Sequence, residues 1–288
     1  MKNLLAALCA VWLLADAANA IAQDKPAVPA ANSTQTMISH GAEPRRELRY
    51  KFSEEVQRVA LEVRIEIETE LDTLSMKQNL PPVYQSLEIV PTSVKDGILN
   101  FRGTFSEMTT QGGAALDPTA VASMHQLAHG LIGKTGVGKV SQRGVVSDAN
   151  GTPNGTHLTS PLPLEAVGIG AQWRVTHPAF LNGVVADNNS TYTILSIEDD
   201  LVKVSVETET AAGKQVMENG SLPPGTSLIV DSIKGGSKGT ITYDLKSMCP
   251  LSIIETKLVQ DGSMIIAGQP DKKISVTIDF TLAVRKQE

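Results

Sequence analysis

Two short segments carry residue types at spacings that could do chemistry. The first is Gly133-Lys-Thr-Gly-Val-Gly-Lys139, which has the GxxxxGK spacing of a loop that cradles phosphate groups. Val140 stands where such a loop needs a Ser or Thr hydroxyl for Mg²⁺, and the run follows a predicted helix instead of a buried strand. We therefore predict no nucleotide site, and interpret the glycines as turn and bulge positions that need positive φ.

The second segment is His125-Gln-Leu-Ala-His129, in which two imidazoles lie one helical turn apart, as in the zinc-binding HExxH pattern. Gln126 replaces the catalytic glutamate, and a neutral amide cannot take a proton from metal-bound water. No third ligand has informative spacing. We expect both histidines on the polar flank of an amphipathic helix, and whether they bind a metal stays open.

Carboxylates also recur on one predicted strand, at Glu62, Glu66, Glu68 and Glu70, with Arg64 among them. Neighbours on one strand face stand about 7 Å apart, too far to share a small cation without ligands from other strands. We therefore expect a hydrated outer sheet face. The sequence names no catalytic, cofactor-binding or metal-binding residue, so we predict no cofactor; the question of enzyme activity stays open and leans to no.

The element that positions these glutamates is a long strand. From Val59 to Leu71 apolar and charged residues alternate, a run that would span roughly 40 Å and requires a large sheet with one wet face. Ile274 to Val284 alternates in the same way. Shorter strands are predicted over residues 48–52, 86–90, 98–105, 171–175, 191–197, 202–206, 228–233, 239–245 and 251–259.

Turn signals separate these strands. We expect turns at Asn79 to Pro82, Asp199-Asp200 and Asp261-Gly262, and a bulge at Gly103. The Asn-x-Ser/Thr triplets should mark exposed turns; they begin at Asn32, Asn150, Asn154, Asn188, Asn189 and Asn219.

One segment has a helical period. Asp117-Pro118 supplies a cap and a first-turn proline, and apolar residues from Val121 to Leu131 recur at three- and four-residue spacing. The predicted fold is mainly β (α+β): a large curved antiparallel sheet or incomplete barrel, with one principal helix near residues 117–132.

The N-terminal residues predict export. Lys2, an apolar stretch and Ala18-Asn-Ala20 make residues 1–20 a signal peptide, although Ala20-Ile-Ala22 also fits a cleavage site. Asp16 interrupts the apolar run before it is long enough to anchor in a membrane. Residues 21–45 read as a flexible arm. We expect residues 46–288 to form a sheet-rich domain. Whether it consists of two related halves (46–160 and 161–288) stays open, although a sequence similarity between residues 138–148 and 235–244 favours two halves. We expect a periplasmic or secreted protein.

Charge and cysteine content limit the partners. A net charge of −6 without basic clusters excludes nucleic acid as an expected partner. Once the signal peptide with Cys9 is removed, Cys249 is the one cysteine left, so no internal disulfide can form. We expect its thiol to be buried, although pairing between chains stays open.

The segment Pro163-Leu-Glu-Ala-Val-Gly-Ile-Gly-Ala-Gln-Trp-Arg-Val175 resembles the Pro-x-x-x-Val-Gly-x-Gly-Ala-x-Trp signature of a family of uncharacterised exported bacterial proteins. The similarity spans roughly residues 46 to 285, although Met248-Cys-Pro250 replaces the family's Gly-x-Pro. The resemblance implies export and a domain of unknown function, and it carries over no catalytic residue. Trp173 itself we interpret as a buried anchor, and we expect Gly168 and Gly170 to allow a tight approach of the chain just before this strand.

These observations lead to a functional expectation. The long strand faces offer more apolar surface than one short helix can cover, so we expect a non-enzymatic binding module for a lipid or other apolar ligand. The alternative is a structural or interaction protein of the bacterial envelope, with another envelope protein as its partner.

Overall fold

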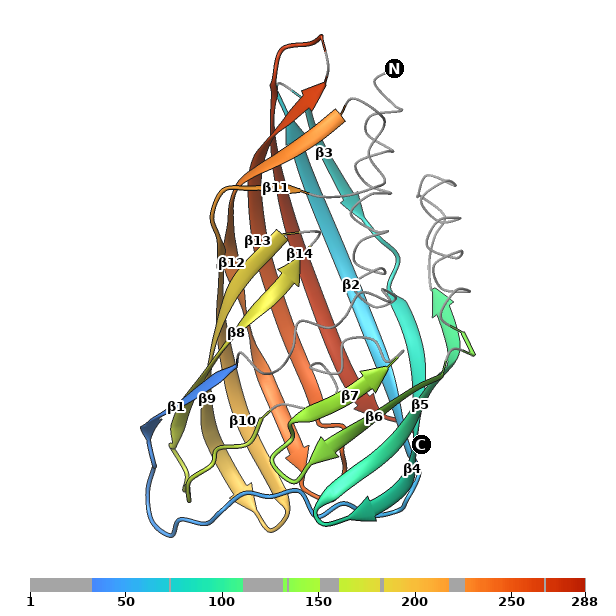
Figure 1. Cartoon of the computed structure of the whole chain (residues 1–288), viewed down its shortest axis with the longest axis vertical. Coiled ribbons are helices and arrows are strands. Elements are labelled where there is room, and N and C mark those ends of the chain that lie inside the picture. Colours follow the sequence, from blue (N-terminus) through green and yellow to red (C-terminus); the bar gives the residue numbers. More distant parts are fainter. Residues whose placement is uncertain are drawn as a thin grey trace.

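The structure, a computed structural model, describes residues 33–72, 74–110, 132–133, 135–150, 161–181, 184–217, 226–266 and 268–287. All regular secondary structure within these ranges is β-strand. Fourteen strands form one antiparallel sheet that does not close into a barrel (Figure 1). The predicted antiparallel sheet is confirmed. The helix expected near residues 117–132 falls, except for Ile132, outside the described residues, none of which is helical.

In chain order the strands are β1 (Thr34–Ser39), β2 (Gln57–Leu71), β3 (Leu74–Asn79), β4 (Val83–Lys95), β5 (Ile98–Thr110), β6 (Thr135–Ser141), β7 (Val146–Asn150), β8 (Gln172–Leu181), β9 (Val184–Glu198), β10 (Leu201–Ala212), β11 (Gln215–Met217), β12 (Thr226–Asp244), β13 (Leu251–Ile266) and β14 (Lys272–Lys286). Across the sheet their order is β1-β8-β9-β10-β12-β13-β14-β2-β4-β5-β6-β7, with β3 beside β2 and β11 beside β12.

Two meanders make up this order, one from β2 to β7 and one from β8 to β14, with β1 added at an edge. They join where β14 pairs along most of its length with β2, from Ile274 opposite Leu71 to Lys286 opposite Val59. The two long alternating runs of the sequence are therefore hydrogen-bonded partners in the middle of the sheet.

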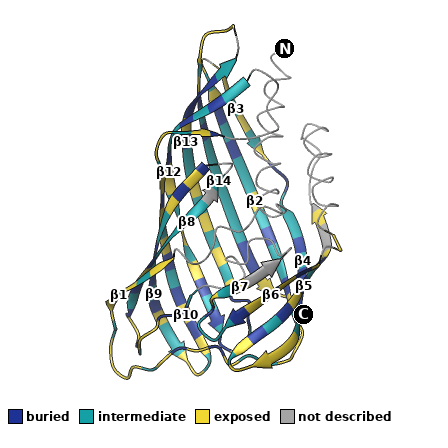
Figure 2. Ribbon diagram, viewed as in Figure 1, coloured by how far each residue is buried: buried dark blue, intermediate teal, exposed yellow. Residues whose placement is uncertain are grey.

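Alternation gives the sheet two different faces (Figure 2). Ile67 on β2 and Val276 on β14 are each 4% exposed, whereas Arg64 and Glu70 on the other side of β2 are exposed. Residues directly opposed in an antiparallel pair share a face, so the register extends both faces across the sheet. We call the face that bears Ile67 the inner face and the opposite one the outer face.

The inner face is the concave side. Figure 1 shows the margins of the sheet, β8 and β9 on one side and β5 to β7 on the other, curving forward of β13, β14 and β2. Contacts between distant strands agree with this curvature. Met248 and Cys249, which follow β12, pack in one buried cluster with Leu99 of β5 and Val140 of β6. The predicted curvature is confirmed.

Residues 40–52, which we call the strap, cross one end of the sheet (Figure 1). The strap bonds to both margins: Arg46 pairs with Val167, just before β8, and the Tyr50 amide donates to the Gln142 carbonyl, just after β6, at 2.9 Å. This end of the curved sheet, the base, is therefore covered.

Arg143, in the turn between β6 and β7, completes the base. Its Nη1 donates to the carbonyls of Leu48 (3.0 Å) and Pro163 (2.7 Å), and its Nη2 donates to the carbonyl of Leu164 (3.0 Å). The Leu162 amide donates in return to the Arg143 carbonyl at 2.9 Å. Because residues 162–164 lead into β8, this one side chain joins the strap to both margins of the sheet.

Two N-terminal predictions are wrong. Residues 48–52 are not a strand but part of the strap, although Leu48 and Tyr50 are fully buried as their alternation predicts. Order does not begin near Arg46, because residues 34–39 of the expected flexible arm form β1 and pair with β8. A six-residue polar edge strand lacks the length and alternation that sequence reasoning needs. Residues 1–32 lie outside the described part of the chain.

Two C-terminal predictions also change. The strands expected over residues 228–233 and 239–245 are parts of the single strand β12, which runs through the glycines between them. These glycines admit close neighbours, since a Cβ on Gly239 would lie 2.1 Å from the Ile253 carbonyl oxygen. β13 likewise continues through Asp261-Gly262, where a turn was expected, opposite a bulge in β12. Glycine here marks a close approach of backbones instead of a chain reversal.

The sequence similarity between residues 138–148 and 235–244 has no structural counterpart. The first segment contains β6, a turn and β7, whereas the second lies inside one continuous strand. Gly103 is not a bulge either, because it pairs regularly with Ile89 and Gly136.

The other predicted strands are found, with longer bounds, whereas the turn expected at Asn79 to Pro82 is wrong. β9 and β10 form the expected hairpin around Asp199-Asp200. Asn79 to Pro82 interrupt the chain without reversing it, because β3 and β4 pair with the same side of β2. Two consecutive prolines lack the amide hydrogens that a continuous ladder would need.

Arg143 should stabilise the fold. We expect Arg143→Met to lower the free energy of unfolding by about 2–4 kcal/mol, because three carbonyls lose a charged donor. Arg174→Met, at an exposed position on the outer face, should change it by less than about 0.5 kcal/mol. Urea unfolding followed by circular dichroism measures both, and equal effects of the two substitutions would show that Arg143 does not hold the base together.

Candidate functional site

The centre of the inner face carries apolar side chains that are only partly buried. They come from three adjacent strands, β13, β14 and β2, and we call them the apolar stripe: Leu258, Ile278, Phe280, Leu282, Val63 and Ile65. Clusters of buried residues lie on both sides, at the base around Trp173 and Leu99, and at the opposite end around Val230 and Ile274. Some members of the stripe pack against the edges of these clusters: Ile65, Ile278 and Leu282. The stripe thus keeps apolar surface in contact with solvent between two closed regions.

Uncharged polar side chains continue the same rows across β9, β10, β12 and β13. Register places Phe280 opposite Thr256, Thr256 opposite Ser237, Ser237 opposite Thr208, and Thr208 opposite Ser190. Their hydroxyls pair, with 2.9 Å between Ser190 and Thr208 and 2.8 Å between Ser237 and Thr256. We call these four residues the hydroxyl band. The inner face therefore joins an apolar surface to a neutral hydrogen-bonding one.

The outer face has the opposite character, with charges of alternating sign. The Lys257 ammonium lies 3.2 Å from the Asp279 carboxylate, and Lys77 lies 2.5 Å from Glu66. A hydrogen bond from the Lys77 ammonium to Glu66 raises the pKa of Lys77 above its ordinary value. Opposite charges on neighbouring strands stabilise each other and hold water at this surface.

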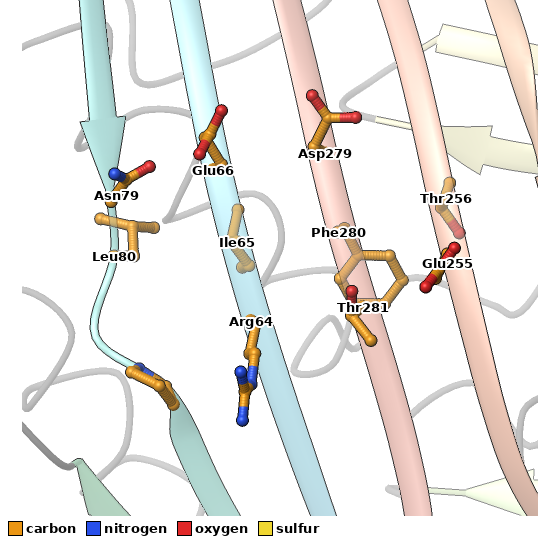
Figure 3. A pocket seen from close by; sticks show the side chains of 11 residues that line it. Arg64, Ile65, Glu66, Asn79, Leu80, Glu255, Thr256, Asp279, Phe280 and Thr281 are labelled. Carbon is orange, nitrogen blue, oxygen red and sulfur yellow. The ribbon is translucent and has the colours of Figure 1, made fainter.

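Two shallow hollows lie over this outer face. One of about 370 Å³ lies beside the break between β3 and β4, and Figure 3 shows Arg64, Glu66 and Asp279 around it. The other, of about 880 Å³, extends over β8 to β14 and shares Glu255 and Asp279 with the first. Both are lined by charges of both signs, which fits a hydrated surface better than a site for an apolar ligand.

The glutamates of β2 mostly lie as predicted on this hydrated face. Glu70 is exposed and Glu66 and Glu68 are half-buried. Glu62 is the exception at 7% exposure, because the guanidinium groups of Arg64 (2.6 Å) and Arg285 (3.1 Å) cover its carboxylate.

The glycine-rich segment is mostly strand. Gly133 takes a positive φ of 76°, as predicted. Gly136 and Gly138 instead lie extended within β6, whose pairing with β7 is irregular around Gly138. The expected positive φ is therefore wrong for these two residues.

Other sequence candidates fall elsewhere. His125 and His129 lie outside the described residues. Asn188 and Asn189 lie in the middle of β9, so the expectation that such triplets mark turns is wrong there. The triplets at Asn32, Asn154 and Asn219 begin outside the described ranges, and Asn150 ends β7.

Trp173 and Cys249 are both buried, as predicted. Trp173 is fully buried and stacks on Tyr192 with ring centres 5.2 Å apart. The tight approach predicted just before β8 is found at Gly168, where a Cβ would lie 1.8 Å from the Ala42 carbonyl oxygen. It is wrong for Gly170, where a Cβ would meet nothing within 4 Å. Cys249 is a free thiol, and burial raises its pKa to about 12.

Within the described ranges, no three or more His, Cys, Asp or Glu side chains cluster in a way that could hold a metal ion. In the same part of the chain, no helix has the length and apolar character needed to cross a bilayer.

Comparisons with known proteins show no family. No family model matches the chain, and no curated protein matches it. Among solved structures, a mutant of Rh. blastica porin is 7% identical with a TM-score of 0.23, covering 79% of this chain and 100% of its own. Ail, the attachment invasion locus protein of Yersinia pestis, is 6% identical with a TM-score of 0.12, covering 80% and 99%. Likenesses at these scores carry no argument.

The buried thiol makes stability depend on pH. The pKa of Cys249 rises from 9.0 to about 12 on folding, so its contribution is complete below pH 9 and is lost as pH rises from 9 to 12. In a Cys9→Ser background, the stability difference between the chain and its Cys249→Ala variant should shift against the cysteine by about 1.4 kcal/mol between pH 8 and pH 10.

Chemical denaturation at the two pH values measures this shift, and the alanine variant serves as the control for all other titrating groups. A thiol reagent at pH 8 should label Cys249 only after unfolding. Rapid labelling of the folded protein would contradict the burial.

Proposed function

We propose that this chain is an exported, non-enzymatic binding module that holds an apolar molecule, such as a lipid, against the inner face of its sheet. The observation that carries the proposal is the apolar stripe. Half-buried side chains such as Phe280 and Ile278 lie together in the middle of a face that carries a cluster of buried residues at each end. Contiguous apolar surface left in water is unfavourable, and on soluble proteins it marks binding sites.

The charged outer face supports this assignment of the inner face. Ion pairs such as Lys257 with Asp279 satisfy the charged outer side chains, and exposed apolar residues such as Ile253 lie among charges there instead of forming a stripe. The curvature directs both margins of the sheet around the apolar stripe, which increases the surface that one small molecule can contact.

The proposed location follows from the sequence. Residues 1–20 have the three-part pattern of a signal peptide, and the segment around Trp173 resembles exported bacterial proteins. A periplasmic or secreted protein meets lipids and other apolar molecules of the envelope, so the location and the proposed ligand agree.

An apolar fluorescent probe tests the proposal. The neutral dye N-phenyl-1-naphthylamine should bind the purified, delipidated protein saturably, with enhanced fluorescence. Leu258→Glu, which puts a charge in the apolar stripe, should weaken binding at least about tenfold. Ile253→Glu is the matched control: it lies on the outer face of the same strand, is 52% exposed, and should leave dye binding unchanged.

Thermal melting of each variant shows whether it is folded. Absence of saturable binding, or equal loss of binding in both variants, would contradict the proposal. Retention of a lipid by the wild-type protein, seen in native mass spectrometry, would support it independently of the dye.

A second candidate, a structural or interaction protein of the envelope, is favoured by one corner of the molecule. Ile38 at the end of β1 and Leu164 and Ile169 before β8 are 49%, 62% and 53% exposed. His40 contacts Glu165, which holds these segments together. Capture of a defined envelope protein by the wild type, abolished by Ile169→Lys without change in dye binding, would select this candidate.

A further inference from the structure

The polar surroundings of the apolar stripe contain no charge. In its two central rows, the inner positions of β8 to β13 are occupied by neutral residues: Val175, His177, Asn188, Ser190, Thr208, Thr210, Gly235, Ser237, Thr256 and Leu258. Burial lowers the pKa of His177 below its ordinary value, so that its ring is neutral at pH 7. The charged residues of these strands, such as Glu207 and Lys257, point to the outer face instead.

The hydroxyl band keeps hydrogen-bonding capacity. A hydroxyl has one donor and two acceptor positions, and each pair in the band uses only one donor. Between Ser237 and Thr256, one hydroxyl donates and the other still holds its own hydrogen. The band can therefore both donate to and accept from a polar group placed beside the apolar stripe.

A buried polar atom on the other side of the stripe also lacks a partner. Gln85 on β4 lies opposite Leu61 on β2, next to Val63 of the stripe, and is 8% exposed. Its Nε2 is buried without a hydrogen-bond partner. Leaving such a donor unpaired is unfavourable, so a bound molecule that presents an uncharged oxygen would improve this site.

From this geometry we propose that the ligand is an uncharged amphiphile that carries hydroxyl groups, with its acyl chain on the apolar stripe and its polar part on the hydroxyl band. The inference rests on the proposed function and narrows it to a chemical class. Thr256 lies next to both Ser237 and Phe280, so one molecule of this kind would contact polar and apolar residues together.

Anionic amphiphiles fit the same surface poorly. Removing a carboxylate or phosphate from water requires a compensating cation or several charged donors. The inner rows around the apolar stripe offer hydroxyl and amide groups but no Lys or Arg. The uncharged band accepts a glycerol-like or other hydroxylated group without that penalty.

Competition for the bound dye tests the inference with three molecules of one chain length. Monolauroylglycerol is uncharged and has hydroxyls, methyl laurate is uncharged without them, and laurate at pH 8 is an anion. Each is used below its critical micelle concentration, and its displacement of N-phenyl-1-naphthylamine from the purified protein is measured. We expect monolauroylglycerol to compete at concentrations about fivefold or more below those of the other two, the effect of one or more hydrogen bonds.

Variants assign this preference to the hydroxyl band. Thr256→Val and, separately, Ser237→Ala should reduce the advantage of monolauroylglycerol over methyl laurate toward equality. Thr240→Val, at an exposed outer position of β12, is the matched control and should keep the advantage. If Thr256→Val lowers the melting temperature, Ser237→Ala alone tests whether the hydroxyl band causes the preference.

The outcomes separate this inference from the proposed function. Equal competition by laurate and monolauroylglycerol, or an unchanged preference in both band variants, would overturn the uncharged, hydroxylated ligand while leaving apolar binding intact. Absence of dye binding to the wild-type protein would overturn both.

Discussion

The hydrogen-bonded ladder between β2 and β14 is the constraint on which the rest of the structure depends. It joins the two meanders, and it fixes the phase in which each strand alternates. A slip of one residue would turn Glu66 and Glu68 toward the inner face and Ile67 toward water. Because neighbouring strands inherit this phase through their own pairing, the apolar stripe, the hydroxyl band and the outer ion pairs all follow from it.

The difference between the two faces has a common physical basis. On the outer face, water and neighbouring opposite charges satisfy the charged side chains. On the inner face, the strap and Arg143 cover only the base, where Leu48 and Tyr50 are buried. The middle of the same face has partly exposed apolar groups beside neutral hydroxyls, and this combination separates it from both the packed base and the hydrated exterior.

Much of the fold could be predicted from local pattern alone. Alternation over Val59 to Leu71 and over Ile274 to Val284 reports burial directly, so both long strands were found with nearly correct bounds. The alternation of apolar and polar residues fails to predict a strand where contacts between backbones determine the structure. Three glycines are typical of chain breaks and yet lie inside β12: Gly235, Gly236 and Gly239. Glycine is needed at these positions because the adjacent strands leave no room for a Cβ. β1 was missed because a short polar edge strand owes its order to β8.

The candidate site was harder to predict from local sequence pattern than the fold was. The apolar stripe was implied by alternation in β2 and β14, but the hydroxyl band was not. Ser190, Thr208, Ser237 and Thr256 come from four strands, and each reads alone as an ordinary polar interruption of an apolar pattern. Only the long-range register places them in one row. Arg143 is a similar case, because its carbonyl partners lie 20, 21 and 95 residues away in the chain.

The position of β14 beside β2 also determines when the two strands can pair during synthesis of the chain. Residues 57–71 leave the ribosome long before residues 272–286, so the first long strand must remain without its principal partner until almost all of the sheet has been translated. During that interval one edge of β2 and its row of valines and isoleucines stay open to wrong pairing. A chain of this topology therefore benefits from any factor that keeps β2 unpaired until β14 has been made.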